Sequence, residues 1–278
     1  MNIDTFAIIG GDLRSAYLAG LLAADGYKVI TTGFDSTDLP PCVTGCTNPA
    51  SAVALADFII LPVPVSTDGT TINAPFSRTR ISIDQVLNAV KPDQCVAGGA
   101  LTSEIHKEAE KRGIKIHDYL KREELAIYNA VPTAEGAIQL AMEELPITIR
   151  GSNCLVTGYG RVGKMLSQML VALGARVTVA ARKYSDLAWA GSRGCCTVEL
   201  QQLDKAGSFD VIFNTIPFPI FNREILGGLD KNTLLIDLAS RPGGVDFKAA
   251  AELQIKTIWA LSLPGRVAPK SAGQIIKN

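Results

Sequence analysis

The sequence lacks an excess of charge of either sign. It has 27 basic and 27 acidic side chains among 278 residues, so its formal net charge at neutral pH is zero. Proteins that bind a nucleic-acid backbone or an anionic membrane surface usually carry a basic excess. The composition therefore gives no sign of a nucleic-acid or membrane partner, and we expect a small molecule or another protein instead.

Long apolar runs are also missing. No uninterrupted apolar segment reaches the roughly 20 residues that a transmembrane helix needs. The opening Met1-Asn2-Ile3-Asp4 does not provide the basic region and apolar core of a secretory signal. Because 47% of the residues are hydrophobic and 19% are charged, the chain can bury a sizeable core. We expect a cytoplasmic protein of two domains.

Cysteine and histidine patterns typical of metal or redox sites are absent. The two histidines, His106 and His117, show no ligand spacing, and no CxxC motif occurs. The six cysteines are Cys42, Cys46, Cys95, Cys154, Cys195 and Cys196. Cys42 and Cys46 lie close enough to share a metal, but no second ligand pair follows them. We interpret all six as reduced thiols and predict no metal site.

The sequence does contain a glycine fingerprint in the context that dinucleotide binding requires. An apolar run over residues 154–157 leads into the turn, a helix-patterned stretch follows it, and Gly174 precedes a second strand over residues 176–181. The first glycine allows a tight turn, the second lets the backbone approach a pyrophosphate, and the third lets the helix pack on the strand. The predicted cofactor residues here are Gly158, Tyr159, Gly160, Arg161, Val162 and Gly163. A glycine turn without a ligand is the alternative.

The end of the second strand indicates which dinucleotide is bound. NAD-binding domains usually place Asp or Glu there, to accept hydrogen bonds from the ribose hydroxyls. This chain has Arg182 and Lys183 instead. A guanidinium suits a 2′-phosphate, so we predict that the cofactor is NADP. The alternative is that both side chains merely belong to a solvated loop.

The N-terminal segment repeats this organisation without the phosphate site. An apolar run over residues 6–9 precedes Gly10, and Gly26 follows at the separation that joins Gly158 to Gly174. Asp12 and Ser15 replace the second and third glycines. A carboxylate in this turn would repel a pyrophosphate. We predict that the first half binds no dinucleotide and that its turn is free for substrate.

The remaining pattern predicts an α/β fold of two Rossmann-like parallel-sheet domains with a cleft between them. Short apolar strands over residues 57–62, 94–98 and 115–119 alternate with helices over 83–90 and 102–112, and residues 68–80 form a loop at the carboxyl edge of the sheet. We expect a flavodoxin-like or Rossmann-like domain over residues 1–130 and an NADP-binding Rossmann domain over residues 151–267. A connecting segment over residues 131–150 holds a helix, residues 133–145, with Thr133 as its N-cap and Glu135 in its first turn. A final helix within residues 268–278 packs back on the first domain by analogy with two-domain dehydrogenases.

Polar residues follow two strands of the second half. Asn214, Thr215 and Pro217 end or follow a strand over residues 211–214, and Ser240 and Arg241 follow one over residues 234–238. Ligands of open α/β sheets bind at the carboxyl ends of strands, so these residues are expected to line the nicotinamide end of the cofactor site. Turn chemistry alone is the alternative explanation.

Several motifs together resemble one family. They are Ala7-Ile8-Ile9-Gly10-Gly11-Asp12, Pro132-Thr133-Ala134-Glu135-Gly136-Ala137, the fingerprint, Asn214-Thr215-Ile216-Pro217, Asp237-Leu238-Ala239-Ser240 with Pro242-Gly243-Gly244, and Leu263-Pro264-Gly265 with Val267-Ala268-Pro269-Lys270. Along nearly its whole length the chain resembles the A subunit of bacterial dipicolinate synthase. The resemblance implies NADP-dependent oxidation, at a CH–CH bond, of dihydrodipicolinate to dipicolinate on a branch of the lysine and diaminopimelate pathway in sporulating bacteria. It also implies a second subunit, the B subunit, with a flavoprotein-like fold. The chain ends at Asn278, earlier than is usual for that family.

That chemistry calls for cations and a proton acceptor. The substrate's two carboxylates need fixed positive charges, for which we favour Arg14 and Arg241 over Arg78 and Lys270. The other predicted substrate-binding residues are Asp12, Thr133 and Ser240, and the predicted catalytic proton acceptors are Glu135 and Asp237. Two alternatives stay open: another NADP oxidoreductase, of the shikimate or alanine dehydrogenase type, or a cofactor-binding regulatory or scaffold subunit. Homo-oligomerisation is also left open.

Overall fold

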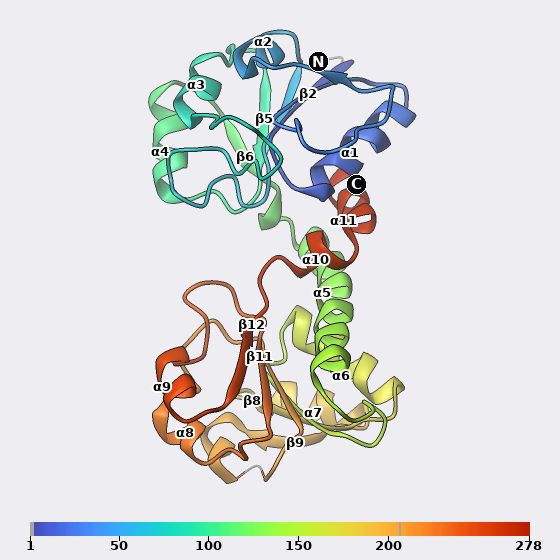
Figure 1. Cartoon of the computed structure of the whole chain (residues 1–278), viewed down its shortest axis with the longest axis vertical. Coiled ribbons are helices and arrows are strands. Elements are labelled where there is room, and N and C mark those ends of the chain that lie inside the picture. The colour runs from blue at the N-terminus through green and yellow to red at the C-terminus, as the bar shows by residue number, and fades with distance from the viewer. Residues whose placement is uncertain (1–2, 206) are drawn as a thin grey trace. The chain divides into compact units, whose positions relative to one another are not determined.

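The computed structural model describes residues 3–205 and 207–278, which form two compact units (Figure 1). The first unit spans the chain up to Ala126 and includes Ala268–Asn278, and the second spans Ile127–Val267. Within the described ranges, none of the helices is both long and apolar enough to cross a bilayer.

The first unit contains a six-stranded parallel sheet with the strand order β3-β2-β1-β4-β5-β6. Its strands are β1 (Thr5–Ile9), β2 (Lys28–Thr32), β3 (Thr44–Gly45), β4 (Phe58–Ile60), β5 (Cys95–Gly98) and β6 (Ile116–Asp118). Its helices are α1 (Leu13–Ala24), α2 (Pro49–Ala54), α3 (Ile83–Asn88), α4 (Ser103–Lys111), the 3₁₀ turn η1 (Tyr119–Lys121) and α11 (Pro269–Lys277). The prediction missed β3 and α2, because both are too short to show a hydrophobic period.

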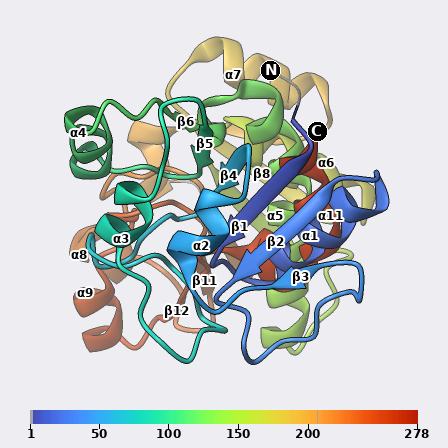
Figure 2. The same ribbon diagram turned by 90° about the horizontal axis from the view of Figure 1, so that it is seen from above.

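Helices cover the two faces of this sheet differently (Figure 2). Alternate strand residues point to opposite faces. Ala7 and Ile59 belong to the core that α2, α3 and α4 build on one face. On the other face, Ile8 and Ile60 belong to a smaller core with α1, against which α11 also packs.

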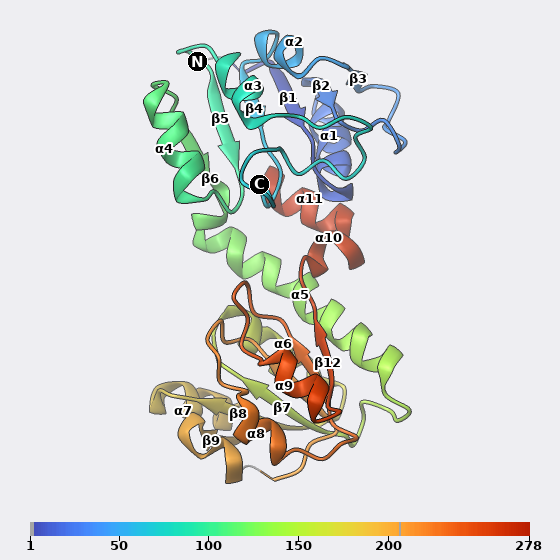
Figure 3. The ribbon, with the colours of Figure 1, turned by 60° about the vertical axis from the view of Figure 1, so that its left-hand side comes forward.

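The second unit contains a sheet with the corresponding order, β12-β11-β10-β7-β8-β9. Its strands β7, β8, β9 and β12 can be followed in Figure 3. Its strands are β7 (Asn153–Thr157), β8 (Arg176–Ala181), β9 (Cys196–Glu199), β10 (Val211–Asn214), β11 (Leu234–Asp237) and β12 (Lys256–Trp259). Its helices are α6 (Arg161–Ala172), α7 (Tyr184–Ser192), the 3₁₀ segment η2 (Leu200–Lys205), α8 (Arg223–Gly227), α9 (Phe247–Glu252) and α10 (Leu263–Val267). Both sheets therefore have the Rossmann strand order, and the expectation of a parallel α/β fold is confirmed.

The long helix α5 (Glu123–Glu144) begins earlier than the sequence pattern predicts. We expected a start at Thr133, after Pro132, because proline is most often found at helix starts. Pro132 instead lies inside the helix, and Thr133 is not an N-cap, since its hydroxyl donates a hydrogen bond to the Asn129 carbonyl at 2.7 Å. The acidic first turn is formed by Glu123 and Glu124, and Glu135 lies well inside the helix.

The internal repeat is visible in the backbone. Gly10 and Gly158 end the first strand of each unit with positive φ angles of 69° and 91°. Gly26 and Gly174 follow the helices α1 and α6 that come after these strands, with φ angles of 93° and 82°. Residues with a Cβ atom rarely adopt these angles, so the matched glycines mark the same strand, turn, helix and strand unit.

The cysteines are expected to differ in reactivity. All six are free thiols, of which Cys42 and Cys196 are exposed while Cys154 and Cys195 are buried. Burial raises the pKa of both the Cys154 and Cys195 thiols, and the thiolate is the reactive form. Iodoacetamide at neutral pH should therefore label Cys42 and Cys196 first, as followed by peptide mass spectrometry. Equal labelling rates at Cys154 and Cys42 would contradict this arrangement.

Candidate functional site

The fingerprint turn has the backbone geometry that close approach of a phosphate needs. Gly158 has a φ angle of 91°, and a Cβ atom on Gly163 would overlap the Gly158 carbonyl oxygen. Helix α6 can therefore approach β7 only because Gly163 has no side chain. Gly160 is exposed, and a Cβ built on it meets nothing within 4 Å. The space in front of Gly160 is thus open to a ligand.

The N-terminus of α6 lies at that space. Gly160 is the N-cap residue and, having no side chain, makes no side-chain cap hydrogen bond to the first turn. First-turn N–H groups, together with the helix dipole, favour an anion. Of the other fingerprint residues, Arg161 is exposed, Val162 is half-buried and Tyr159 is buried. The Tyr159 hydroxyl is buried and has no hydrogen-bond partner in the part of the chain that the structure describes.

The corresponding turn of the first unit contains a carboxylate, the side chain of Asp12. Asp12 caps α1, and its Oδ1 accepts the backbone N–H of Arg14 at 3.0 Å. A loop from a distant part of the chain closes over the turn. Its Asn73 carbonyl accepts the N–H of Gly11 at 2.8 Å, and Ile72 lies against Gly10. This geometry fits a half that binds no dinucleotide, but it corrects our expectation that the turn is free for substrate.

Arg14 is committed to this same arrangement. Only 6% of the residue is exposed, its Nη2 lies 2.7 Å from Asp12 Oδ2, and the same atom donates to the Val63 carbonyl at 2.7 Å. The ion pair neutralises a charge that we predicted would meet a substrate carboxylate. We therefore do not retain Arg14 and Asp12 as substrate-binding residues, because each is the other's partner.

Arg182 and Lys183 follow directly after β8, next to the fingerprint strand β7 in the sheet. Both side chains are exposed. Among the described residues neither has an ion-pair partner. The carboxyl end of this strand faces the ribose in dinucleotide-binding sheets. Two unpaired cations thus lie where a 2′-phosphate would be recognised.

A buried polar network joins the carboxyl ends of β7, β10 and β11. Thr157 donates to Asn214 Oδ1 at 2.7 Å, and Asn214 Nδ2 donates to Asp237 Oδ1 at 2.7 Å. The Asp237 carboxylate also accepts the N–H groups of Ala239 at 3.1 Å and Gly244 at 2.8 Å. Asn214 and Asp237 have no exposed surface. The network fixes the loops after β10 and β11.

This network corrects two predicted roles. Asp237 cannot reach a substrate as a proton acceptor, because both its oxygens are enclosed and hydrogen-bonded. Asn214 cannot contact the nicotinamide directly, because its amide serves Thr157, Asp237 and the backbone of Ile216. A position at the end of a strand does not by itself show whether a polar side chain is buried in a structural hydrogen-bond network or exposed to a ligand.

Asp237→Asn is therefore expected to destabilise the second unit. An amide would turn one acceptor into a donor that faces N–H groups, at a cost of about 1–3 kcal/mol in the free energy of unfolding. Urea unfolding measures the loss, with the exposed Asp230→Asn as the control. Unchanged stability with a severe loss of turnover would instead restore Asp237 as a catalytic group.

The exposed candidates lie on the loops that this network holds. Ser240 and Arg241 are exposed, and the Arg241 guanidinium lies over the Trp259 ring with its Cζ 5.9 Å from the ring centroid. The sequence pattern gave no sign of Trp259, which lies on β12 and donates to the Ala239 carbonyl at 3.0 Å. Thr215 approaches Gly158 closely, and Pro217 is exposed. The loop after β10 therefore borders the fingerprint turn.

The remaining candidates are dispersed. Glu135 is exposed and Thr133 is half-buried, both on α5 within the second unit. Arg78 and Lys270 are exposed in the first unit. Within the described ranges, no three His, Cys, Asp or Glu residues are grouped so as to hold a metal.

Fold and site together define an α/β protein of two Rossmann-type units, with a dinucleotide fingerprint in the second unit. The transhydrogenase of Sinorhizobium meliloti shares the fold at a TM-score of 0.70, with 15% identity over 98% of this chain and 91% of that one. The family model for the N-terminal domain of the dipicolinate synthase A subunit matches residues 5–120.

Two relatives then establish the family. The A subunit of dipicolinate synthase from Bacillus subtilis (strain 168) is 36% identical over 98% of this chain and 93% of its own length. The crystal structure of the corresponding protein from Bacillus halodurans matches with a TM-score of 0.90, at 32% identity over 99% of this chain and 95% of that one. The chain belongs to the family of dipicolinate synthase A subunits, and the predicted resemblance is confirmed.

Proposed function

We propose that this chain is the NADP-binding A subunit of a dipicolinate synthase, which oxidises dihydrodipicolinate to dipicolinate. The observation that carries the proposal is the intact fingerprint turn in a chain that matches the B. subtilis protein over 98% of its length. In the reaction the dihydropyridine loses a hydride and a proton and becomes aromatic. NADP supplies the hydride acceptor when bound.

The residues of the second unit fit such a cofactor. The N-terminus and dipole of α6 suit its pyrophosphate, and the open space before Gly160 allows the backbone approach. Arg182 and Lys183 suit the 2′-phosphate, because they are exposed cations without partners in the described chain. Thr215 borders the turn from the neighbouring loop, which also carries the exposed Pro217.

For the substrate we retain the candidates on exposed surfaces. Arg241 suits one carboxylate, since its guanidinium lies over the Trp259 ring and has no acidic partner among the described residues. Ser240 beside it can donate a hydrogen bond to the same group. Thr133 is retained as a hydrogen-bonding residue and Glu135 as the proton acceptor, both on α5.

Turnover tests this function directly. The purified chain, together with the second subunit of dipicolinate synthase, is given freshly prepared dihydrodipicolinate and NADP, and the absorbance of NADPH is followed. We expect NADPH and dipicolinate to form in equal amounts, and neither to form when this chain, NADP or the substrate is omitted. No reduction of NADP by the complete mixture would contradict the proposal.

A second candidate is a cofactor-binding regulatory or scaffold subunit, with the reacting groups supplied by the partner. The observation that favours it is the enclosure of Asp237, which leaves Glu135 as the one predicted proton acceptor that is exposed. The same assay without the second subunit separates the two candidates. Turnover by the isolated chain would exclude the scaffold function.

A further inference from the structure

The two sheets differ in how helices cover one of their faces. In the second unit, α5 and α6 share one face of the sheet, and buried residues of α5 pack in one core with β10 and β11. In the first unit, α1 corresponds to α6, and α11 lies against α1. Among the described residues, no helix as long as α5 covers β4, β5 and β6 on that face.

The exposure of matched residues shows the consequence. One residue from each of four neighbouring strands forms a row across each sheet on the face in question, and the two rows correspond by register. In the second unit the row is Val156, Phe213, Ile236 and Ile258, of which the first three are completely buried. In the first unit the row is Ile8, Ile60, Ala97 and His117. Ile8 is 1% exposed and Ile60 is 8% exposed, whereas Ala97 is half-buried and His117 is exposed. The first sheet thus loses its cover progressively toward β6.

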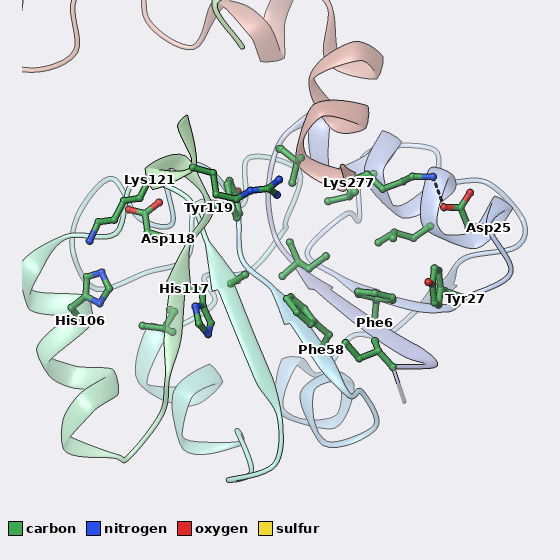
Figure 4. Close-up of a pocket in the computed structure, with 18 residues that line it drawn as sticks. Phe6, Asp25, Tyr27, Phe58, His106, His117, Asp118, Tyr119, Lys121 and Lys277 are labelled. Carbon is green, nitrogen blue, oxygen red and sulfur yellow. Dashed lines mark hydrogen bonds and ion pairs between the residues drawn. The ribbon is translucent and has the colours of Figure 1, made fainter. Parts of the chain in front are cut away.

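A hollow of about 700 Å³ lies over this uncovered part (Figure 4). Its floor includes Phe6, Phe58, Ile60 and Ala97, and Leu22 of α1 forms part of its wall. The opposite face of the same strands is closed, since Ile59 and Val96 are completely buried. Parallel sheets are almost always covered on both faces. An apolar hollow over half of one face therefore indicates a missing layer of protein.

The rim of the hollow carries unpaired basic and imidazole groups. Its two carboxylates are already engaged, because Asp25 pairs with Lys277 and Asp118 accepts the N–H groups of Leu101 and Leu120. Three other rim side chains lack partners. Within the described part of the chain, Lys121 and the exposed His117 have none, and the Nε2 atom of His106 is buried without a hydrogen bond.

We propose that the hollow receives an acidic amphipathic helix of the second subunit, which lies over β4, β5 and β6 as α5 lies over β10, β11 and β12. This inference rests on the proposed function, because the existence of a second subunit is part of that proposal. The apolar floor suits the apolar side of a helix, and the basic rim suits carboxylates along its edges. A second copy of this chain would instead bring like charges together.

Binding to the purified second subunit tests the surface. The double variant His117→Glu/Lys121→Glu reverses the rim charge at exposed positions, so the fold should be retained, as checked by circular dichroism. The matched control is Lys115→Glu, an exposed lysine that precedes β6 outside the hollow. By calorimetry we expect the double variant to raise the Kd by at least about 30-fold and the control by less than about 2-fold.

Three results would overturn the proposal. The double variant could bind as tightly as the unchanged chain, or the unchanged chain could fail to bind the second subunit. Light scattering could instead show a homodimer of the unchanged chain that the double variant loses. Cofactor binding by the isolated chain is measured in parallel. Normal complex formation without turnover would contradict the proposed function and leave the docking surface standing.

Discussion

Replacing Arg182 with aspartate is expected to weaken NADP binding by about 100-fold and NAD binding by less than about 3-fold. Arg182 is exposed directly after β8 and has no ion-pair partner among the described residues, so its charge is free for a 2′-phosphate. An aspartate there would repel that phosphate but could accept hydrogen bonds from the ribose hydroxyls of NAD. Calorimetric titration of the isolated chain with each cofactor measures the two constants.

The same strand supplies a matched control for this prediction. Arg176 begins β8 at the opposite end, is exposed, and lies away from the carboxyl edge of the sheet. Arg176→Asp makes the same charge change and should leave both binding constants within about 2-fold of their original values. Equal losses of NADP and NAD affinity in Arg182→Asp would show that Arg182 does not recognise the 2′-phosphate.

Gly160→Ala is expected to weaken cofactor binding severely while leaving the stability of the free protein unchanged. The added Cβ meets nothing within 4 Å, and the Gly160 φ angle of −78° suits any residue. In the complex, however, the methyl group would stand where the pyrophosphate must approach the backbone. We expect NADP affinity to fall by about 100-fold or more with an unchanged melting temperature. Tight NADP binding by this variant would contradict the assigned pyrophosphate position.

Two further glycines separate this effect from a general loss of structure. A Cβ on Gly163 would overlap the Gly158 carbonyl oxygen, so Gly163→Ala should lower both the melting temperature and the cofactor affinity. A Cβ on Gly227 in α8 meets nothing, so Gly227→Ala should change neither. Of these three glycine variants, only Gly160→Ala is expected to lower the cofactor affinity without lowering the melting temperature.

Local pattern was sufficient for much of this fold. The predicted strands over residues 176–181 and 211–214 coincide with β8 and β10, because each is an apolar run bounded by clear turns. The glycine repeat placed the two halves in correspondence, since the positive φ angles at Gly10 and Gly158 depend on local sequence. Pro132 misled the prediction for α5, because its neighbours stabilise the helix in spite of the proline.

The candidate site was less predictable, because contacts between distant segments decide it. Asp12, which stands where the fingerprint has its second glycine, correctly indicated that this turn differs from the one at Gly158 to Gly163. That Asn73 would cover this turn could not be inferred from residues near it. Asp237 similarly looked available at a strand end, and only its hydrogen bonds to Asn214 and Gly244 show that it is enclosed.

A crystal structure of the chain with NADP and dipicolinate tests the central claim most directly. The account predicts the pyrophosphate at the start of α6 beside Gly160, the 2′-phosphate on Arg182, and a dipicolinate carboxylate on Arg241 near the nicotinamide. NADP bound at the turn of Asp12 in the first unit, or a 2′-phosphate that does not contact Arg182, would contradict it.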